Sequence, residues 1–589
     1  MSEQELLAEL SAARAWETIA TIVSQFPSRL AGSTTAWEAA GFMHQQLLAN
    51  DVAAELMEYP GLVSFPGPAS LEVVTPERRT IAATVLAHSA PTSPEGVEAE
   101  LVDVGTGSRE RCLEAGIGAK ITLSELSYAP PRQEKARIMP LLGAVGAVML
   151  NWGYDDSALL PYGSVKPCWG NPTRLTAATE MPTIPCLGVS RADGLALREL
   201  CARGTVRVRL RAECSDEWRT LRQAVGRLPR QPDSAEFAVL GGHMDAWYGQ
   251  SASDNAAGNA CFLELARTFQ QHASELKRGL VIGFWVGHET GTMIGSSTYV
   301  DRRWDDLREN AVAYIQIDQP GLVGTTVWES RSDVELRDYH TAIERRILGE
   351  MPLEWGRLTK IGDTSFFGVG VPSIASRSAF TKDEVRAMGM GSLGWWHHTD
   401  ESTLERLDKD LLGTHLKVYA AYLWGLLTLP ILPARFAPTV KQVVDRIEQL
   451  LPHGEPILLA GAADLANEAL AAVERLDATV DSWRKRTTKG SLPQEIEHAL
   501  NTALKRLSRI LVPLGGTVAD RYSHDPYGLS AQATILPGLF ELPHLTMLPP
   551  TSDERHLLWT ELIRQRNRLA DGMRETRELA ERTVAAVGA

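Results

Sequence analysis

Five residues with metal-binding side chains follow apolar runs in the middle of the chain: His243, Asp254, Glu289, Asp318 and His398. Two of them offer imidazole nitrogens and three offer carboxylate oxygens, a mixture of donors that suits Zn²⁺. Mn²⁺ and Co²⁺ accept similar donors and are the alternatives. The two oxygens of Asp254 also allow this residue to bridge two ions. We therefore predict a metal centre, with zinc as the expected ion.

The segments that must position these residues read as an α/β sheet. Apolar runs at 237–240, 280–286 and 311–317 alternate with helical patterns between about 220 and 430, which predicts helices on both faces of a sheet. The candidate ligands lie at the ends of these runs or in the loops after them, where open α/β sheets place their sites. The alternative is a coincidence of helix caps and core polar residues. Because all five candidate ligands follow apolar runs in one order, we favour the metal site over this coincidence.

Differences in residue pattern divide the chain into further predicted domains. Residues 1–90 begin with helices, interrupted by a loop that carries Arg29, which we expect to be buried. Residues 91–220 contain short β-branched runs between glycines and prolines, which predicts a small β-rich domain. Residues 221–438 hold the α/β pattern, and residues 439–589 are dominated by amphipathic helical patterns.

Composition limits the partners and the compartment. The net charge of −14 and the lack of a Lys/Arg-rich run make a nucleic acid an unexpected partner. No apolar run reaches the roughly 18 residues that cross a bilayer, so no membrane partner is expected. The N-terminus has no signal-peptide pattern, and six scattered cysteines without a CxxC pair indicate reduced thiols. We expect a cytoplasmic protein.

The order of the candidate ligands resembles that of the co-catalytic zinc peptidase family, which includes bacterial leucyl-type aminopeptidases, glutamate carboxypeptidase II and the transferrin receptor. The positions that match are His243, Asp254-Asn255, His288-Glu289, Asp318 and His398-Thr399. The resemblance implies the zinc exopeptidase fold, a central mixed sheet flanked by helices. It also implies two Zn²⁺ per chain, one held by His243 and Asp318, the other by Glu289 and His398, with Asp254 as the bridge.

The resemblance extends beyond the metal motif. Residues 28–33 are similar to a loop that precedes the catalytic domain of the family, and residues 98–215 resemble the protease-associated domain inserted in its larger members. Residues 521–526 and the helical tail resemble the C-terminal helical domain, which implies a homodimer. Asp245 matches the aspartate that orients a ligand histidine and tunes its basicity.

One position departs from the family pattern. The family's general base is the first Glu of a Glu-Glu pair, and this chain has His288 there. We expect His288 or a nearby carboxylate to accept the proton of a water activated by two zinc ions. The expected reaction is hydrolysis of an amide bond, either by an aminopeptidase-type enzyme on a small peptide or by an amidohydrolase on a non-peptide small molecule. Two alternatives stay open: a non-catalytic dimeric binding protein on the same fold, and a mononuclear metal enzyme of another reaction type.

Several residues near these motifs allow two interpretations. We expect His397 to form part of the pocket wall rather than a second ligand. Asp363 either lies near the site, as the family pattern implies, or belongs to a turn. Five aromatic residues either floor a pocket or belong to the core, and we slightly favour the pocket: Trp247, Tyr248, Trp285, Trp395 and Trp396.

Overall fold

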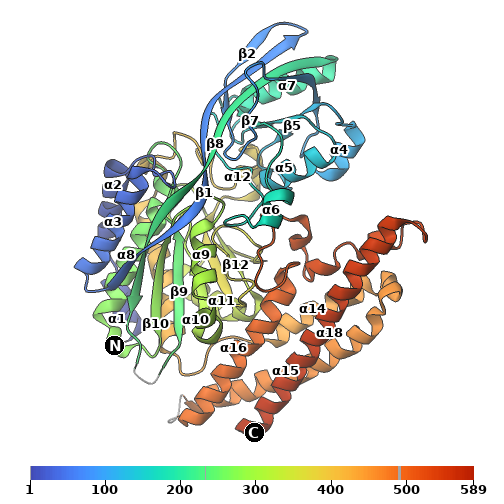
Figure 1. Cartoon of the computed structure of the whole chain (residues 1–589). Helices are drawn as coiled ribbons and strands as arrows, with labels where there is room; N and C mark the ends of the chain where they lie inside the picture. The colour runs from blue at the N-terminus through green and yellow to red at the C-terminus, as the bar shows by residue number, and fades with distance from the viewer. Residues whose placement is uncertain (1, 232–233, 488–491, 589) are drawn as a thin grey trace.

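The computed structural model describes residues 2–231, 234–487 and 492–588. The sheet order among these residues is β13-β12-β14-β11-β9-β10-β8-β4-β5-β6-β7-β3, with β1 alongside β8 and β2 alongside β1. Figure 1 shows the lower part of this sheet within a large helix-flanked body and the upper part within a smaller lobe. A bundle of helices, drawn in orange and red, lies beside the body.

The body is organised around four parallel strands. They are β9 (Phe237–His243), β10 (Gly279–Trp285), β11 (Ala311–Gln316) and β14 (Ser373–Ala379), in the spatial order β10-β9-β11-β14. Every residue of β9, β10 and β11 is buried, because helices cover both faces. This explains why the runs are nearly continuous in apolar residues. At the edge, β12 (Val327–Ser332) is antiparallel to β14 and parallel to β13 (Leu353–Arg357).

Two 23-residue strands connect the body to the upper lobe. β1 (Ala53–Thr75) and β8 (Val206–Leu228) pair antiparallel along almost their whole length. The end of β8 pairs with β10 in the body, and its beginning pairs with β4 in the lobe. Figure 1 shows the two strands rising together from one part to the other.

The lobe is a second α/β layer around parallel strands. Its strands are β2 (Arg79–Ile81), β3 (Ala83–Val85), β4 (Val97–Asp103), β5 (Ile121–Glu125), β6 (Gly146–Leu150) and β7 (Cys186–Val189). Its helices are α4 (Arg109–Ala115), α5 (Arg132–Leu141), α6 (Arg174–Thr179) and α7 (Arg191–Arg203). The lobe has an apolar cluster of its own, formed by strand residues such as Leu101, Leu123 and Leu187.

Helices cover the body on both sides of its sheet. One layer contains α1 (Glu3–Glu9), α2 (Ala12–Gln25), α3 (Thr34–Ala49), α8 (Ala257–Gln271) and α13 (Lys409–Thr428). On the other side, α9 (Ile294–Arg302) and α10 (Trp304–Asn310) pack against β10 and β11. The remaining helices of the body are α11 (Arg337–Leu348) and α12 (Lys382–Ala387).

The C-terminal part is helical. Its helices are α14 (Ala437–Leu450), α15 (Leu459–Thr487), α16 (Gln494–Gly516), α17 (Leu542–Leu545) and α18 (Asp553–Val587). One-turn helices complete the chain at η1 (Ala252–Ala256), η2 (Ala273–Glu275), η3 (Val334–Leu336), η4 (Leu404–Arg406), η5 (Leu451–His453), η6 (Glu455–Ile457), η7 (Ser530–Ala533) and η8 (Pro537–Leu539). The buried guanidinium of Arg509 on α16 donates to the carbonyls of Leu307, Arg308, Ala311 and Gly370, which attaches the bundle to the body.

The mixed α/β architecture with flanking helices is confirmed. β9, β10 and β11 contain the three apolar runs assigned as strands, and α14 and α18 contain helical patterns assigned in the tail. The expected domain boundaries at 90/91, 220/221 and 438/439 remain predictions. The structure adds that β1 and β8 run through both parts of one continuous sheet and so join the lobe to the body.

Candidate metal centre

Three of the predicted ligands follow adjacent parallel strands. His243 is the last residue of β9, Glu289 lies in the turn after β10, and Asp318 lies two residues beyond β11. Because β10, β9 and β11 are neighbours and run in the same direction, their carboxyl ends meet at one edge of the sheet. Asp254 joins them from η1, and His398 joins them from the loop before η4. The structure therefore brings all five predicted ligands together.

The Asp254 carboxylate lies between two pairs of ligands. Its Oδ1 is 3.0 Å from Nε2 of His243, which is itself 3.5 Å from Oδ1 of Asp318. Its Oδ2 is 3.0 Å from Nε2 of His398, which is 3.4 Å from Oε1 of Glu289. Each oxygen of Asp254 thus faces one histidine-carboxylate pair, the arrangement that a bridging carboxylate requires.

The donor atoms are buried and incompletely satisfied. His243 is fully buried, and Asp254, Glu289 and His398 are at most 7% exposed. Oε1 of Glu289 and Oδ1 of Asp318 make no hydrogen bond to any residue that the structure describes. A buried carboxylate oxygen without a donor costs free energy, and a cation removes that cost. The donor set and its unpaired oxygens therefore fit metal ions.

Without metal, these side chains compete for protons. Burial lowers the pKa of His398, but Glu289 and Asp254 outweigh it and raise that pKa to about 9. The pKa of His243 is likewise raised well above its ordinary value, against the effect of burial, by Asp254 and Asp318. Burial raises the pKa of Asp254, but the histidines beside it lower that pKa well below its usual range. At neutral pH the metal-free site holds protons on imidazoles that a metal ion must displace.

Asp245 contacts both the His243 imidazole and the turn after β10. His243 Nδ1 donates to the main-chain oxygen of Asp245 at 2.8 Å, not to its carboxylate. The carboxylate instead accepts the backbone N–H groups of Gly287, His288 and Glu289 at 2.9 to 3.1 Å. Asp245 is fully buried, and its carboxylate is directed toward the turn after β10. Asp245 thus contacts the ligand histidine through its main chain and supports the turn after β10 through its carboxylate.

Arg29 anchors the loop that leads to Asp254. Its guanidinium is fully buried and donates to the carbonyls of Met244, Gln250 and Ser251. Burial lowers its pKa to about 10, so the group remains charged at neutral pH. The expectation of a buried arginine is confirmed, and its partners show that it fixes both ends of the segment between two predicted ligands.

His288 lies against the ligand cluster. Its ring stacks on that of His243 at a centroid distance of 3.9 Å and an angle of 17°. Its Nδ1 donates to Oδ2 of Asp363 at 3.0 Å, and Oδ1 of Asp363 accepts from the Ser296 hydroxyl at 2.8 Å. Burial lowers the pKa of His288 and Asp363 raises it, with a net rise in the metal-free chain. Asp363 is therefore a buried partner of His288, as the family pattern implied.

The upper lobe holds the loop that carries His398. His398 Nδ1 donates to the carbonyl of Tyr162 at 3.2 Å, and the Trp152 indole donates to the carbonyl of His397 at 3.1 Å. The Trp152 ring also stacks on His397. His397 lines the pocket, as expected, but its Nδ1 is also 3.3 Å from Oδ2 of Asp254. The lobe thus contributes directly to the geometry of the metal centre.

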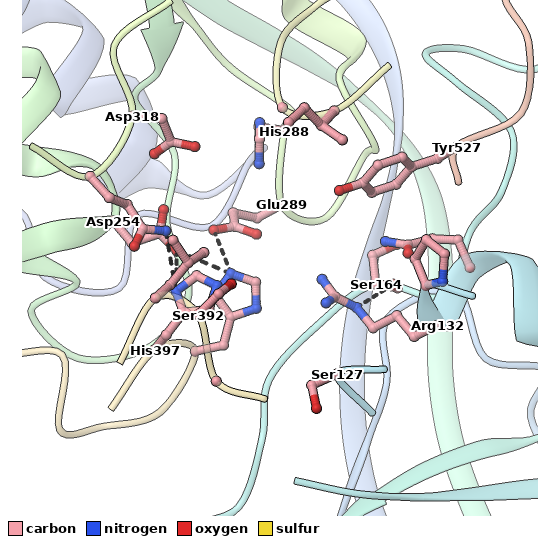
Figure 2. Close-up of a pocket in the computed structure, with 18 of the residues that line it drawn as sticks. Ser127, Arg132, Ser164, Asp254, His288, Glu289, Asp318, Ser392, His397 and Tyr527 are labelled. Atoms are coloured by element: carbon pink, nitrogen blue, oxygen red, sulfur yellow. Dashed lines mark hydrogen bonds and ion pairs between the residues drawn. The ribbon is translucent and has the colours of Figure 1, made fainter. Parts of the chain in front are cut away.

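A pocket of about 420 Å³ opens beside the ligands. It is lined from three parts of the chain: the body, the lobe through Arg132 and Ser164, and the helical part through Tyr527. Figure 2 shows Arg132 and Tyr527 across the pocket from Asp254 and Asp318. Our sequence analysis missed Arg132 and Tyr527; the only signal was that Tyr527 directly follows the segment 521–526 singled out for its resemblance.

The expected aromatic floor of the pocket is wrong. None of the five aromatic residues proposed for it lines the pocket among the described residues. Trp285 is fully buried and donates to the Tyr314 hydroxyl at 3.2 Å, a core position. The Trp247 indole donates to Glu289 instead of facing the pocket. Trp152, from the lobe, is an aromatic residue that does line it.

The comparisons with known proteins agree with this geometry. The family model that matches is "Peptidase family M28", over residues 224–423, a range that contains all five predicted ligands. That segment belongs to peptidase family M28.

Two relatives match a longer part of the chain. A probable glutamate carboxypeptidase of Zea mays is 25% identical over 344 residues, covering 49% of this chain and 48% of that protein. Carboxypeptidase Q of Xenopus laevis is 23% identical, covering 53% of this chain and 65% of that protein. The chain thus spans about half to two thirds of the length of these relatives.

The fold of the chain is also found among solved structures. A zinc aminopeptidase from Bacillus subtilis superposes with a TM-score of 0.54 at 18% identity, covering 71% of this chain and 96% of that chain. At this identity the likeness establishes the fold. Among the residues that the structure describes, no helix combines the length and apolar composition needed to cross a bilayer.

Proposed function

We propose that this M28 chain is a metal-dependent hydrolase that cleaves an amide bond with two zinc ions. The observation that carries the proposal is the position of Asp254, whose two oxygens face two separate histidine-carboxylate pairs. His243 and Asp318 would hold one ion, and Glu289 and His398 the other. The zinc aminopeptidase and the carboxypeptidases among the similar proteins support this assignment.

The chemistry supplied by bound zinc would be polarisation of the scissile carbonyl and a lowered pKa of the attacking water. The residues of the chain perform the remaining tasks. Arg29 and Asp245 hold the ligand segments in place, so that the donors need no rearrangement when a substrate binds. The lobe closes one side of the pocket through Trp152 and Ser164, which limits the access of bulk water.

His288 is placed to accept the proton of the attacking water. Its Nδ1 donates to Asp363, which fixes the tautomer and leaves the lone pair of Nε2 free to accept. The ring lines the pocket and stacks on a predicted ligand, so proton transfer at Nε2 takes place beside the reacting centre. We propose that the His288-Asp363 pair replaces the glutamate that serves as base in the resembled family.

The far side of the pocket is suited to an anionic group of the substrate. Arg132 donates from Nε to the carbonyl of Ser164 at 2.9 Å and makes no ion pair with a described residue. Burial lowers its pKa, yet an arginine remains charged at neutral pH. A half-buried guanidinium without a carboxylate partner favours a carboxylate ligand. Two of the similar proteins are named as carboxypeptidases, which supports the proposal that the substrate carries a carboxylate beyond the scissile bond.

A paired substrate panel tests the function. We expect the zinc-loaded chain to hydrolyse N-acyl dipeptides with a free C-terminal carboxylate and to be slower on the corresponding C-terminal amides. Arg132→Gln should raise KM for the first group and leave the second group unchanged. Chelation should abolish both activities, and zinc should restore them. A chain that binds two zinc ions but hydrolyses no peptide or small amide would contradict the proposal.

A further inference from the structure

We propose that Trp247 is a positioning residue that selects which oxygen of Glu289 binds metal and thereby serves only one of the two metal positions. The inference rests on the proposed function, since it assumes that Glu289 is a metal ligand. From the sequence, Trp247 was expected either to line a pocket or to belong to the core.

The two oxygens of the Glu289 carboxylate have different surroundings. Oε2 accepts the indole N–H of Trp247 at 2.7 Å. Oε1 faces Nε2 of His398 at 3.4 Å and makes no hydrogen bond to a described residue. One oxygen is therefore occupied by a neutral donor, and the other is directed into the ligand cluster. A carboxylate held in this way offers one oxygen to a metal ion rather than two.

Trp247 contacts both ligands of the same pair. Besides the hydrogen bond to Glu289, its ring meets the His398 ring edge to face, with centroids 5.9 Å apart at 64°. Trp247 makes no hydrogen bond or ring contact with His243 or Asp318, the other pair. The effect of this indole should therefore be confined to the ion that Glu289 and His398 would hold.

The position of Trp247 is itself fixed. The side chain is almost completely buried, with the residue 2% exposed. Its ring stacks on Tyr162 at 6.2 Å and 21°, and the Tyr162 hydroxyl donates to Asp400 at 2.9 Å. The Tyr162 carbonyl accepts from His398 Nδ1. Trp247 is thus part of a rigid group that orients both ligands of one pair.

Removing the indole N–H has a defined consequence. Trp247→Phe keeps an aromatic ring and leaves Oε2 of Glu289 without its donor, a cost that rotation of the carboxylate toward the metal would relieve. Groups that orient a metal ligand from outside typically account for about 10- to 100-fold in affinity. We expect one zinc ion to bind about 10- to 100-fold more weakly and the other to bind as in the wild type.

Competition with a chromophoric zinc chelator tests the inference on the whole chain. The matched control is Trp285→Phe, which removes the same atoms from a fully buried tryptophan whose indole donates to Tyr314 rather than to a ligand. We expect two unchanged affinities in the control. Loss confined to one ion in Trp247→Phe supports the proposal. Unchanged affinities, or equal losses for both ions, would overturn it.

A second variant separates hydrogen bonding from packing. Trp247→Gln keeps an N–H donor but loses the ring, so the proposal expects it to retain more affinity for the weakened ion than Trp247→Phe. A purely structural role for the ring predicts the reverse order, and that result would overturn the proposal. If Trp247→Phe does not fold, Trp247→Gln still tests it, because the proposal expects affinity within about tenfold of the wild type.

Cobalt supplies a readout that does not depend on activity. A carboxylate that changes from one donor oxygen to two raises the coordination number, which weakens the visible absorption of Co²⁺. We expect weaker absorption from one equivalent of Co²⁺ in Trp247→Phe; an unchanged spectrum would overturn the proposal. A wild-type chain that binds no metal would instead contradict the proposed function, so the two failures are distinguishable.

Discussion

Asp254 is the residue on which both predicted metal positions depend. Because each of its oxygens faces a different pair of ligands, Asp254→Ala should remove both ions and all hydrolysis. Asp318→Ala changes one pair only and should spare one ion. Metal content per folded chain, measured by mass spectrometry after gel filtration, checks both expectations. Two ions retained in Asp254→Ala would show that this residue is not a bridge.

His288 can be tested separately from the ligands. His288→Ala should retain full metal content and lose about 10²- to 10⁴-fold in kcat, the usual contribution of a general base. Two bound dications should also bring its pKa below about 6.5, the reverse of its direction in the metal-free chain. Asp363→Asn should cause a smaller loss of kcat at the same metal content. Loss of metal with recovery at high zinc would instead identify His288 as a ligand.

Metal uptake should depend on pH through His398. The pKa of this histidine is raised to about 9 in the metal-free chain, so below pH 9 a proton occupies the nitrogen that a metal needs. The apparent affinity for zinc should therefore rise with pH and level off near pH 9, by up to about tenfold per pH unit from this group. Zinc titrations in matched buffers from pH 6 to pH 9 measure the slope. A flat profile would contradict the assignment of His398 as a ligand.

At the scale of elements, an acidic pair at the start of η3, Asp333 and Glu335, lies where the body meets the helical part. Asp333 and Glu335 are buried, and Glu335 accepts from the Thr439 hydroxyl of α14 at 3.1 Å. Burial raises the pKa of Glu335 to about 7. Between about pH 4.5 and 7, the unfolded chain has lost this proton while the folded chain keeps it.

The stability of the chain should therefore fall as pH rises through this window. Below about pH 4.5 both states bind the proton, and above about pH 7 the full loss has been reached. In the wild type, the titration of Glu335 should lower the free energy of unfolding by up to about 1.4 kcal/mol for each unit that the pH rises in this window. Glu335→Gln cannot lose a proton, so this part of the pH dependence should disappear. Urea unfolding of the metal-free wild type and variant at pH 5 and pH 8 gives the comparison. Equal pH dependence in the two proteins would contradict the raised pKa.

At the scale of the whole molecule, we propose that the helical part, residues 439–589, forms a homodimer, as the resemblance implied. The buried attachment of Arg509 to four carbonyls of the body means that this part also stabilises the body. Deleting it should give either a monomer or insoluble protein. Light scattering of the intact chain checks the dimer directly. A well-behaved wild-type monomer would rule out the dimer.

The sequence by itself determined the core of the fold and the members of the candidate site. Continuous apolar runs predicted β9, β10 and β11, because strands covered on both faces need apolar side chains at every position. Five histidine and carboxylate residues at the ends of apolar runs predicted the metal centre, because such side chains are the donors that zinc prefers. Each of these strands and ligands lies in its own short segment of the sequence, which is why the sequence could predict it.

Only the tertiary structure decided how distant segments meet at the centre. Arg132 and Tyr527 are 395 positions apart and share a pocket because the lobe and the helical part both pack over the carboxyl edge of the sheet. The contact from Trp247 to Glu289, and the direction of the Asp245 carboxylate, depend on side-chain rotation and on the path of the turn after β10. No residue type or spacing specifies such directions, because they result from packing between elements that the chain brings together only on folding.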